Sequence, residues 1–522
     1  MLVRYTRVGE RVYVFVNDMS SVTRSYMESF VNDIYENVRK VSLTPAKCAL
    51  DLSDGSERAD YVNQDYILNG LGRPHRNINI MFTYYPLDKE WPARASEVNT
   101  DPNVRDAWGY CYDDYPTYGG GIGGSKDADV FEQMRDIRRH GQDVTLTLTI
   151  DCAVGDEHLI AIAKDLSTFG RIRLRINHEC TGTWFQHNRR YTVKQIGEFF
   201  VRFDKIIKQY APNVKTILCA GFVNKDGELE YEDDLIEAYK AADIWSGDRY
   251  MALHFGWPFD VCEKEVPSFT CSPVKTFYDF VGRTADYLKQ VTGQDKPFVA
   301  SELNIDGDVT GPARQGDGIK ILADMLKEQD ERKLTSFTMY QFRDEGRLGL
   351  EVSDPNNKAI GIRQPLYDVY KKILHDDYFK PGLELGKELA LTKTNSFKNQ
   401  VKLRWGGAED AEGIALRLKL EKTPVFMDMS FEEDLSLMIC VNDRWFYKAP
   451  QTKVIDLMPA FFEAGQPEVK PGEELDILVF ATPPTGENEP GRIDYETTIK
   501  KLPKLHLRYE PVARLTKYKT YK

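Results

Sequence analysis

The middle of the chain alternates short apolar runs with amphipathic stretches of helical period. Residues 144–150 are rich in β-branched side chains, which is typical of a strand. Across residues 192–210, apolar side chains recur every three or four positions and Pro212 follows, which predicts a helix that ends before the proline. Strands are expected at 77–83, 144–150, 172–176, 216–222, 250–255, 298–302 and 335–342, and helices at 156–169, 192–210, 234–242, 277–291, 318–329 and 365–374.

This order of strand and then helix repeats over about 230 residues, which predicts a parallel sheet. Seven strands lie between residues 77 and 342, and either 46–52 or 11–16 supplies an eighth. Eight strand–helix units predict a (β/α)8 barrel, the TIM fold, which we place at residues 41–380. The main alternative is an open doubly wound sheet. The glycine-rich run Gly119–Gly124 lies in a long loop, however, and not at the strand-to-helix turn that such a sheet needs.

After about residue 385 the pattern changes to short strand-like runs separated by Gly, Pro, Asn and Asp. Residues 385–522 are therefore predicted to form an all-β sandwich domain, with Trp405 and Trp445 in its core rather than on an exposed glycan platform. Residues 1–40 are a separate N-terminal segment, in which Val12–Val16 is a candidate to add a strand to the β domain. The barrel would then be inserted between two pieces of that domain. The expected strands of the β domain are 401–405, 414–420, 435–441, 445–447, 454–457, 475–480 and 502–507.

Composition and charge narrow the class of protein. The 522 residues are 42% hydrophobic and 29% charged, which excludes a mainly disordered chain. A net charge of −12 gives no general attraction to phosphate backbones, so we expect no nucleic-acid partner. No apolar run reaches the ~18 residues of a membrane span, so we expect no membrane partner. The start of the chain lacks the apolar region of a signal peptide, which favours the cytoplasm for the chain as written and leaves a secreted mature form as the alternative.

Metal and cofactor chemistry is not expected. The 8 cysteines form no Cys-x-x-Cys pair, and their spacings do not match a zinc site. The residues after His178 do not complete a His-Glu-x-x-His motif, and no Gly-x-Ser-x-Gly nucleophile turn occurs. Cys262 and Cys271 are the pair that could close a short disulfide loop in an exported protein.

The chemistry of a TIM barrel sits at the C-terminal ends of its strands and in the loops that follow. The fourth expected strand ends in Arg175–Glu179, and the seventh ends in Ala300–Asn304. Glu179 and Glu302 thus close two strands on opposite sides of the barrel mouth. Retaining glycoside cleavage needs two carboxyl groups across one bond, one to protonate the leaving oxygen and one to attack the anomeric carbon. A single glutamate at a strand end is often a solvated residue or half of an ion pair, but two in matching polar clusters favour catalysis.

The run ArgIleAsnHisGluCysThrGlyThrTrpPhe, residues 175–185, resembles the acid/base segment of glycoside hydrolase family 26, the β-mannanase family of clan GH-A. That segment reads Arg-x-x-His-Glu-x-Asn-Gly-x-Trp-Phe or Tyr. Lys296 and Pro297, followed by Glu302, are similar to the nucleophile strand of the clan, and the resemblance covers roughly residues 75–375. The residues that match the acid/base segment are Arg175, His178, Glu179, Gly182, Trp184 and Phe185.

The resemblance implies a retaining hydrolase of β-linked glycans that needs no cofactor or metal and whose partner is an oligosaccharide or polysaccharide substrate. It implies that Glu179 is the general acid/base and Glu302 the nucleophile, held ionised by Arg175. In the same clan, a Tyr or His at the end of the sixth strand donates to the nucleophile. The supporting residues are therefore Arg175, His178, His254 and Tyr250, and the expected sugar-binding residues are Trp184, Trp257, Tyr112, Tyr118, Trp108, Gln341 and Arg343.

Three departures from the family pattern leave the sugar open. Thr181 stands where the family has Asn, and the fifth strand lacks the expected Trp. The eighth strand carries Tyr340, Gln341 and Phe342 where the clan places a Trp. A related family of clan GH-A therefore stays open. Two other classes also remain: a non-catalytic glycan-binding barrel, and a non-hydrolytic barrel enzyme such as a lyase or isomerase.

Overall fold

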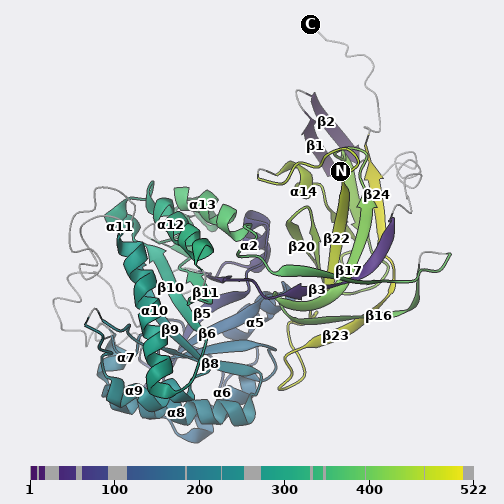
Figure 1. Ribbon diagram of the computed structural model, residues 1–522. Coiled ribbons are helices and arrows are strands. Elements are labelled where there is room, and N and C mark those ends of the chain that lie inside the picture. Colours follow the sequence, from purple (N-terminus) through teal and green to yellow (C-terminus); the bar gives the residue numbers. More distant parts are fainter. Residues whose placement is uncertain are drawn as a thin grey trace.

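We describe the protein from a computed structural model of the whole chain. The structure describes residues 2–8, 11–17, 35–54, 61–91, 115–182, 185–224, 226–251, 272–329, 333–344, 348–393, 396–463 and 465–509, and for residues 2–17, 186, 272–273 and 308–309 it describes the backbone alone. Figure 1 shows a strand barrel surrounded by helices, and beside it a part built mostly of strands. Among the described helices, none is both long and apolar enough to cross a membrane.

Eight parallel strands close into a barrel in the order β10-β11-β4-β5-β6-β7-β8-β9, which confirms the predicted TIM fold. The first strand of the barrel falls in the run 46–52, one of the two candidates from the sequence. The strands are β4 (Ala49–Ser53), β5 (Asn77–Tyr84), β6 (Asp143–Ile150), β7 (Ile172–Ile176), β8 (Val214–Cys219), β9 (Ile244–Met251), β10 (Phe298–Ile305) and β11 (Ser336–Met339).

Helices cover the outside of the barrel. Helix α8 begins with a capping box in which Thr192 and Gln195 satisfy each other's backbone N–H groups, and it ends before Pro212. Apolar side chains of these helices pack on the outward faces of the strands and form the largest core of the protein. The helices are α2 (Gln64–Leu71), α5 (Asp129–Arg139), α6 (Asp156–Leu166), α7 (Gln186–Arg189), α8 (Val193–Tyr210), α9 (Glu232–Ala241), α10 (Ser272–Thr292), α11 (Gly307–Thr310), α12 (Gln315–Glu328) and α13 (Pro365–Leu374).

The inside of the barrel is polar, unlike the branched apolar filling that is usual in this fold. Arg175 on β7 contacts side chains on β9 and β10, and Arg173 contacts Asp51 on β4. None of these strands neighbours β7 in the barrel, so both arginines must point inward. Leu174, between them, points outward into the helix-covered core. The inward polar residues that contact one another are Asp51, Asn77, Asn79, Thr147, Arg173, Arg175, Asp248 and Glu302.

The β domain is a sandwich whose core lies between two antiparallel sheets. The larger sheet has the order β15-β3-β17-β22-β19-β20 with β16 and β23 attached, and the smaller has the order β21-β18-β24. Its elements are β3 (Asn37–Thr44), β15 (Gly382–Glu388), β16 (Ser396–Gly407), β17 (Asp410–Lys419), β18 (Phe426–Ser430), β19 (Leu437–Val441), β20 (Arg444–Lys448), β21 (Val454–Asp456), α14 (Pro459–Phe462), β22 (Glu474–Ala481), β23 (Tyr495–Lys501) and β24 (Lys504–Arg508).

The barrel is inserted into the β domain, but not through the segment expected from the sequence. Strand β3, which continues past the expected boundary at residue 40, pairs with β15 and β17. The prediction for Val12–Val16 is wrong, because these residues lie in β2 (Arg11–Asn17), which pairs along its whole length with β1 (Leu2–Val8). A partner two residues away in the chain closes a far shorter loop than the β domain would.

The barrel also carries an extra sheet after its eighth strand. It has the order β12-β13-β14, with β12 (Arg343–Asp344), β13 (Glu351–Asp354) and β14 (Asn357–Arg363). Sequence patterns did not predict this sheet, because the side chains of β14 are almost all exposed and show no alternation of burial.

The glycine-rich loop at residues 119–124 encloses a carboxylate of the chain itself. Gly119, Gly121 and Gly123 adopt positive φ angles of 69°, 76° and 72°, which turns the loop tightly. The backbone N–H of Gly121 donates to Asp165 Oδ2 at 2.7 Å, and Lys126 Nζ lies 2.5 Å from Asp165 Oδ1. The loop therefore binds a carboxylate of the same chain, Asp165.

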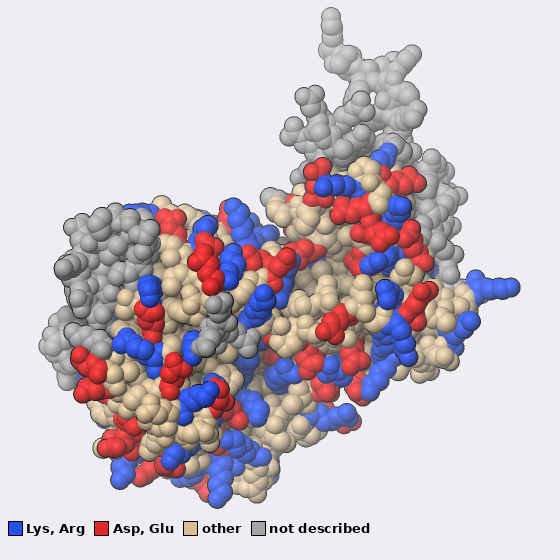
Figure 2. All heavy atoms as spheres, in the orientation of Figure 1, with Lys and Arg blue, Asp and Glu red and all other residues tan. Residues whose placement is uncertain are grey.

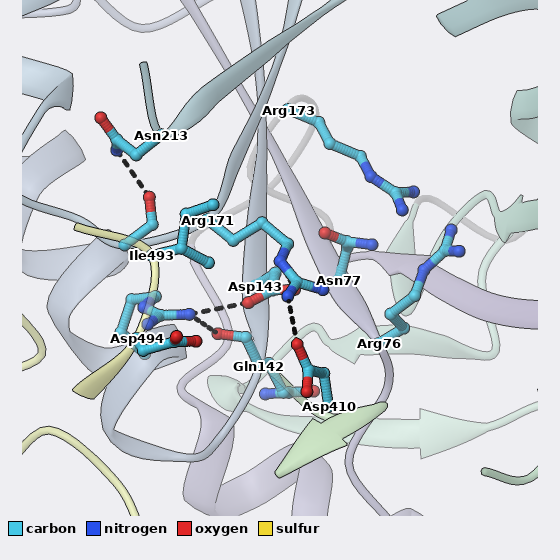
Figure 3. Close-up of polar contacts among 12 residues, drawn as sticks. Arg76, Asn77, Gln142, Asp143, Arg171, Arg173, Asn213, Asp410, Ile493 and Asp494 are labelled. Atoms are coloured by element: carbon cyan, nitrogen blue, oxygen red, sulfur yellow. Dashed lines mark hydrogen bonds and ion pairs between the residues drawn. The ribbon is translucent and has the colours of Figure 1, made fainter. Parts of the chain in front are cut away.

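The N-terminal ends of the barrel strands contact the β domain through charged side chains (Figure 3). Arg171 Nη2 reaches Asp410 Oδ2 of the β domain at 2.9 Å. Within the barrel domain, the buried Arg138 Nη1 of helix α5 pairs with Asp143 Oδ1 at 2.7 Å. Trp405 is fully buried at this seam in an apolar cluster shared by the two domains, as expected for a core tryptophan. On the face drawn in Figure 2, acidic and basic side chains are interspersed over both domains, so the net charge of −12 is not gathered in one patch there.

Candidate active site

The side chain of Arg175 ties two carboxylates together at the C-terminal side of the barrel. Its Nη2 lies 2.5 Å from Glu302 Oε1, and its Nη1 lies 2.9 Å from Asp248 Oδ2. Its Nε donates to Thr147 Oγ1 at 2.7 Å. The guanidinium is fully buried, so its position is fixed by these three contacts.

Glu302 receives hydrogen bonds on both carboxylate oxygens. Tyr250 donates its hydroxyl to Oε2 at 2.6 Å, opposite the contact of Arg175 with Oε1. The backbone N–H of Glu302 donates to Asp248 Oδ1 at 2.9 Å, which fixes the main chain of this residue as well. These donors therefore hold the carboxylate of Glu302 in one orientation.

Asp248 is the residue of this cluster that the sequence patterns missed. Its side chain is fully buried, and it also accepts from the thiol of Cys219 at 3.2 Å. Burial, and next the negative charge of Glu302, raise the pKa of Asp248 to about 7, although Arg175 opposes both effects. The strand that carries it begins at Ile244, six residues before the expected start at Tyr250. Its SerGlyAspArg run resembles a loop because the inside of this barrel is polar.

Glu179 completes a group of three carboxylates. One carboxylate oxygen each from Glu179, Asp248 and Glu302 lie within 4.8 Å of one another. Retaining glycosidases hold their two carboxyl groups ~5–5.5 Å apart, whereas inverting enzymes need ~6.5–9.5 Å. Three carboxylates this close could also ligate a divalent cation. Arg175 already pairs with Asp248 and Glu302, however, so a cation would have to compete with a guanidinium that is fixed in place.

The backbone that carries Glu179 is strained. Asn177 and Glu179 adopt left-handed φ angles of 44° and 46°, one on each side of His178. For a non-glycine residue this conformation costs roughly 1–2 kcal/mol, so neighbouring groups must hold it. Asn177 Oδ1 accepts from the N–H of Ile150 at 2.7 Å, and the N–H of Gly182 donates to the carbonyl of Glu179 at 2.7 Å. Strain of this kind is concentrated at functional sites.

His178 packs among aromatic rings. It is 2% exposed, and its ring centroid lies 4.6 Å from Phe185, 5.5 Å from His187 and 5.8 Å from Tyr115. The structure therefore places it in an aromatic cluster with Tyr115, Phe185 and His187. A direct bond to sugar or nucleophile stays a prediction.

Two of the expected sugar-binding residues have structural roles instead. The prediction for Tyr118 is wrong, because its ring is fully buried against Tyr84 and Phe131 and offers no face to a sugar. The prediction for Arg343 is also wrong. Its guanidinium donates to Glu351 Oε2 and to the carbonyl of Lys358, each at 3.0 Å, and lies over the ring of Tyr66.

Of the remaining residues expected at the site, Gln341 is described by the structure and others are not. Gln341 is fully buried, and neither atom of its side-chain amide has a hydrogen-bond partner among the described residues. Its role toward substrate stays a prediction. The residues that lie outside the described part of the chain are Trp108, Tyr112, Trp184, His254, Trp257, Cys262 and Cys271.

Comparisons with known proteins give likeness in structure only. No protein-family model matches the sequence, and no curated protein matches it. Among solved structures, the chain resembles a GH26 β-mannanase from Bacteroides ovatus, with 11% identity and a TM-score of 0.40, over 64% of this chain and 90% of that one. It also resembles a family 51 α-L-arabinofuranosidase from Bifidobacterium longum, with 11% identity and a TM-score of 0.41, over 84% and 97%. A glucosidase from Croceicoccus marinus matches with 10% identity and a TM-score of 0.43, over 85% and 99%. Likenesses this distant do not decide the activity, which depends on the side chains described above.

Proposed function

We propose that the protein is a retaining glycoside hydrolase for β-linked glycans, β-mannanase-like or of a related β-glycanase class. The observation that supports this most directly is the close approach of Glu179 and Glu302, with carboxylate oxygens within 4.8 Å of each other. The two groups are also held in different ways. Glu302 is fixed by Arg175 and Tyr250, whereas Glu179 sits on a loop at the barrel mouth.

This difference supports one assignment of the two chemical roles. Glu302, whose carboxylate is held in one orientation, attacks the anomeric carbon and forms a glycosyl-enzyme ester, while Glu179 gives its proton to the leaving oxygen. Glu179 then takes a proton from a water molecule, which attacks the anomeric carbon and releases Glu302. Because each step inverts the anomeric carbon, the product keeps the configuration of the substrate.

The first experiment finds a substrate and its stereochemistry. The full-length protein is screened against mannan, xylan, β-glucans and aryl β-glycosides, and the anomer released first is identified by NMR. Retained configuration is expected, and an inverted product would reject Glu302 as nucleophile. Activity that depends on an added divalent cation and is lost with a chelator would favour the metal-dependent barrel enzyme instead.

The second experiment separates the roles of the two glutamates. Glu179→Gln should lower turnover by ~10²–10⁴-fold on substrates whose leaving group needs a proton. It should keep far more activity on 2,4-dinitrophenyl glycosides, which need none. Glu302→Gln should lose activity on both kinds of substrate. Near wild-type rates for both variants on every substrate would show that these residues do not carry the reaction.

A further inference from the structure

We propose that Asn188 is a positioning residue that holds the acid/base loop, so that Glu179 keeps its left-handed backbone conformation and its carboxyl group stays aimed at Glu302. The inference rests on the proposed role of Glu179 as the acid/base. It concerns a side chain nine residues further along the chain, on the short helix α7, that no sequence motif singled out.

The contacts of Asn188 are with the main chain of the loop. Its Nδ2 donates to the carbonyl of Glu179 at 2.8 Å and to the carbonyl of Gly182 at 2.9 Å. The N–H of Gly182 donates back to the carbonyl of Glu179 at 2.7 Å. One amide group thus joins both ends of the turn that starts at the acid/base.

Asn188 is itself held in place, by burial and by its two hydrogen bonds to the loop. The residue is 7% exposed, and its Oδ1 has no hydrogen-bond partner among the described residues. The two carbonyls therefore orient the amide, and among the described residues no other group bonds to it. A buried polar atom without a partner is unusual in a native structure and calls for an explanation, which the proposed role of the Nδ2 group supplies.

The need for such a clamp follows from where Glu179 sits. Strand β7 ends at Ile176, so Glu179 lies three residues beyond the barrel sheet. Its φ of 46° is a conformation that glutamate rarely adopts by itself. A return to ordinary backbone angles would rotate the side chain away from its present direction. Glu302, in contrast, lies within β10, and both of its carboxylate oxygens are held by other side chains.

Asn213 offers a matched control in the same protein. Its Nδ2 donates to the carbonyls of Leu166 and Gly170 at 3.2 and 2.6 Å, and the residue is 2% exposed. It lies just before β8, at the opposite end of the barrel (Figure 3). Asn213 therefore also donates two buried hydrogen bonds to backbone carbonyls, but Glu179 is not near it.

The test compares leaving groups in the full-length protein. For Asn188→Ala, kcat/KM for phenyl glycosides of the accepted sugar should fall by ~10–100-fold, since proton donation is impaired. For the 2,4-dinitrophenyl glycoside of the same sugar it should fall by no more than ~3-fold, since that leaving group needs no proton. Asn188→Asp, which keeps the size but loses the amide donors, should show the same pattern. Asn213→Ala should lower the melting temperature and change both substrates equally.

Three outcomes would count against the inference. If Asn188→Ala and Asn188→Asp lower kcat/KM equally for both leaving groups, the residue only supports folding. If both variants match the wild type on both substrates, the clamp is not needed. If Glu179→Gln itself shows no dependence on the leaving group, the proposed function fails and the role of Asn188 fails with it. Should Asn188→Ala not fold, the isosteric Asn188→Asp variant decides between the first two outcomes.

Discussion

Two buried carboxylates inside the same barrel, Asp51 toward its N-terminal end and Asp248 toward its C-terminal end, differ in their share of positive charge. Asp51 Oδ2 lies 2.5 Å from Arg76 Nη2 and 3.5 Å from Arg173 Nη1. Asp248 shares the single guanidinium of Arg175 with Glu302. Two arginines thus contact Asp51, whereas Asp248 and Glu302 share one.

The two carboxylates titrate differently as a result. Burial acts to raise the pKa of Asp51, but the charges of Arg76 and Arg173 bring it below its ordinary value. For Asp248, burial and the charge of Glu302 prevail, and the pKa rises to about 7. The number of cations per carboxylate, and not the depth of burial, therefore separates a permanent structural charge from one that changes near neutral pH.

Replacing the two inward arginines of β7 gives the largest contrast between the ends. Arg175→Gln removes a charge-assisted hydrogen bond of ~1.5–3 kcal/mol from Glu302, which corresponds to a fall in turnover of roughly 10- to 150-fold. Arg173→Gln leaves Asp51 with Arg76 and should change turnover little, while lowering the free energy of unfolding by about 1–3 kcal/mol. Turnover on an aryl glycoside and urea unfolding measure both effects. Equal losses of turnover would remove the functional distinction between the ends.

Removing each aspartate should change the pH dependence of stability in opposite directions. The folded pKa of Asp248 is about 7, above its ordinary 3.8, so the folded state binds this proton more tightly. The free energy of unfolding therefore falls as pH rises from about 4 to about 7, by up to ~4 kcal/mol. Asp248→Asn should abolish this fall.

Asp51→Asn is the counterpart. The folded pKa of Asp51 is lowered, so its stabilisation is present above its ordinary pKa and is lost as pH falls through the folded value. The variant should therefore lose more stability at pH 7.5 than at low pH. Urea unfolding of both variants between about pH 2.5 and pH 7.5 tests the pair, because the change at Asp51 lies below its ordinary pKa and the change at Asp248 lies above it. The same slope in both would mean that the charge ratio does not govern them.

A smaller effect is expected where the titratable group is the cation. Burial lowers the pKa of His140, but hydrogen bonds with Asp136 and Asp65 outweigh this effect and raise the pKa to about 9. The ring lies 4.1 Å from that of Tyr447 in the β domain. Its stabilisation is complete below about pH 6.5 and is lost as pH rises through about 9, by up to ~3 kcal/mol. The stability difference between wild type and His140→Gln should therefore be larger at pH 6 than at pH 9.5, and a constant difference would show that His140 does not titrate there.

The smallest effect is expected at the rim of the barrel base. The side chains of Arg171 and Asp410 are 30% and 39% exposed, so their bridge between the domains is screened by water. Asp410→Asn should cost within ~1 kcal/mol. Asp143→Asn is the buried control, because it leaves Arg138 without its carboxylate, and it should cost ~3–5 kcal/mol. Equal unfolding midpoints in urea for the two variants would contradict this order.

The barrel could be predicted from the sequence because the outward faces of its strands are apolar and the helices between them are strongly amphipathic. Strand β7 and helix α13 begin and end where the patterns placed them. Strand β9 was misplaced, because its inward residues are Ser246, Asp248 and Tyr250 and its pattern is not that of a buried strand. Strands β15 and β14 are exposed along most of their length, so no hydrophobic alternation marks them.

The candidate site was accessible from the sequence only in part. Glu179 follows the end of β7 and Glu302 lies within β10, and both stand inside polar runs that the sequence shows plainly. The pairing of Arg343 with Glu351 could not be predicted, because a small local sheet that no sequence pattern indicates brings the two residues together. Asn188 was missed for a related reason, since its role depends on main-chain atoms, which leave no trace in side-chain patterns.

The insertion of the barrel has a consequence for the order in which the chain is made. Thr44 of β3 pairs with Gly382 of β15, a partner synthesised 338 residues later (382 − 44). At ~5–20 residues per second, β3 leaves the ribosome roughly 20–70 seconds before its own sheet can form. All eight strands of the barrel are made during that interval, because they lie between β3 and β15 in the sequence. An unpaired strand invites pairing with other chains, and charged side chains are the usual protection. Strand β3 carries two adjacent charged side chains of this kind, Arg39 and Lys40, which oppose pairing with other chains before β15 is made.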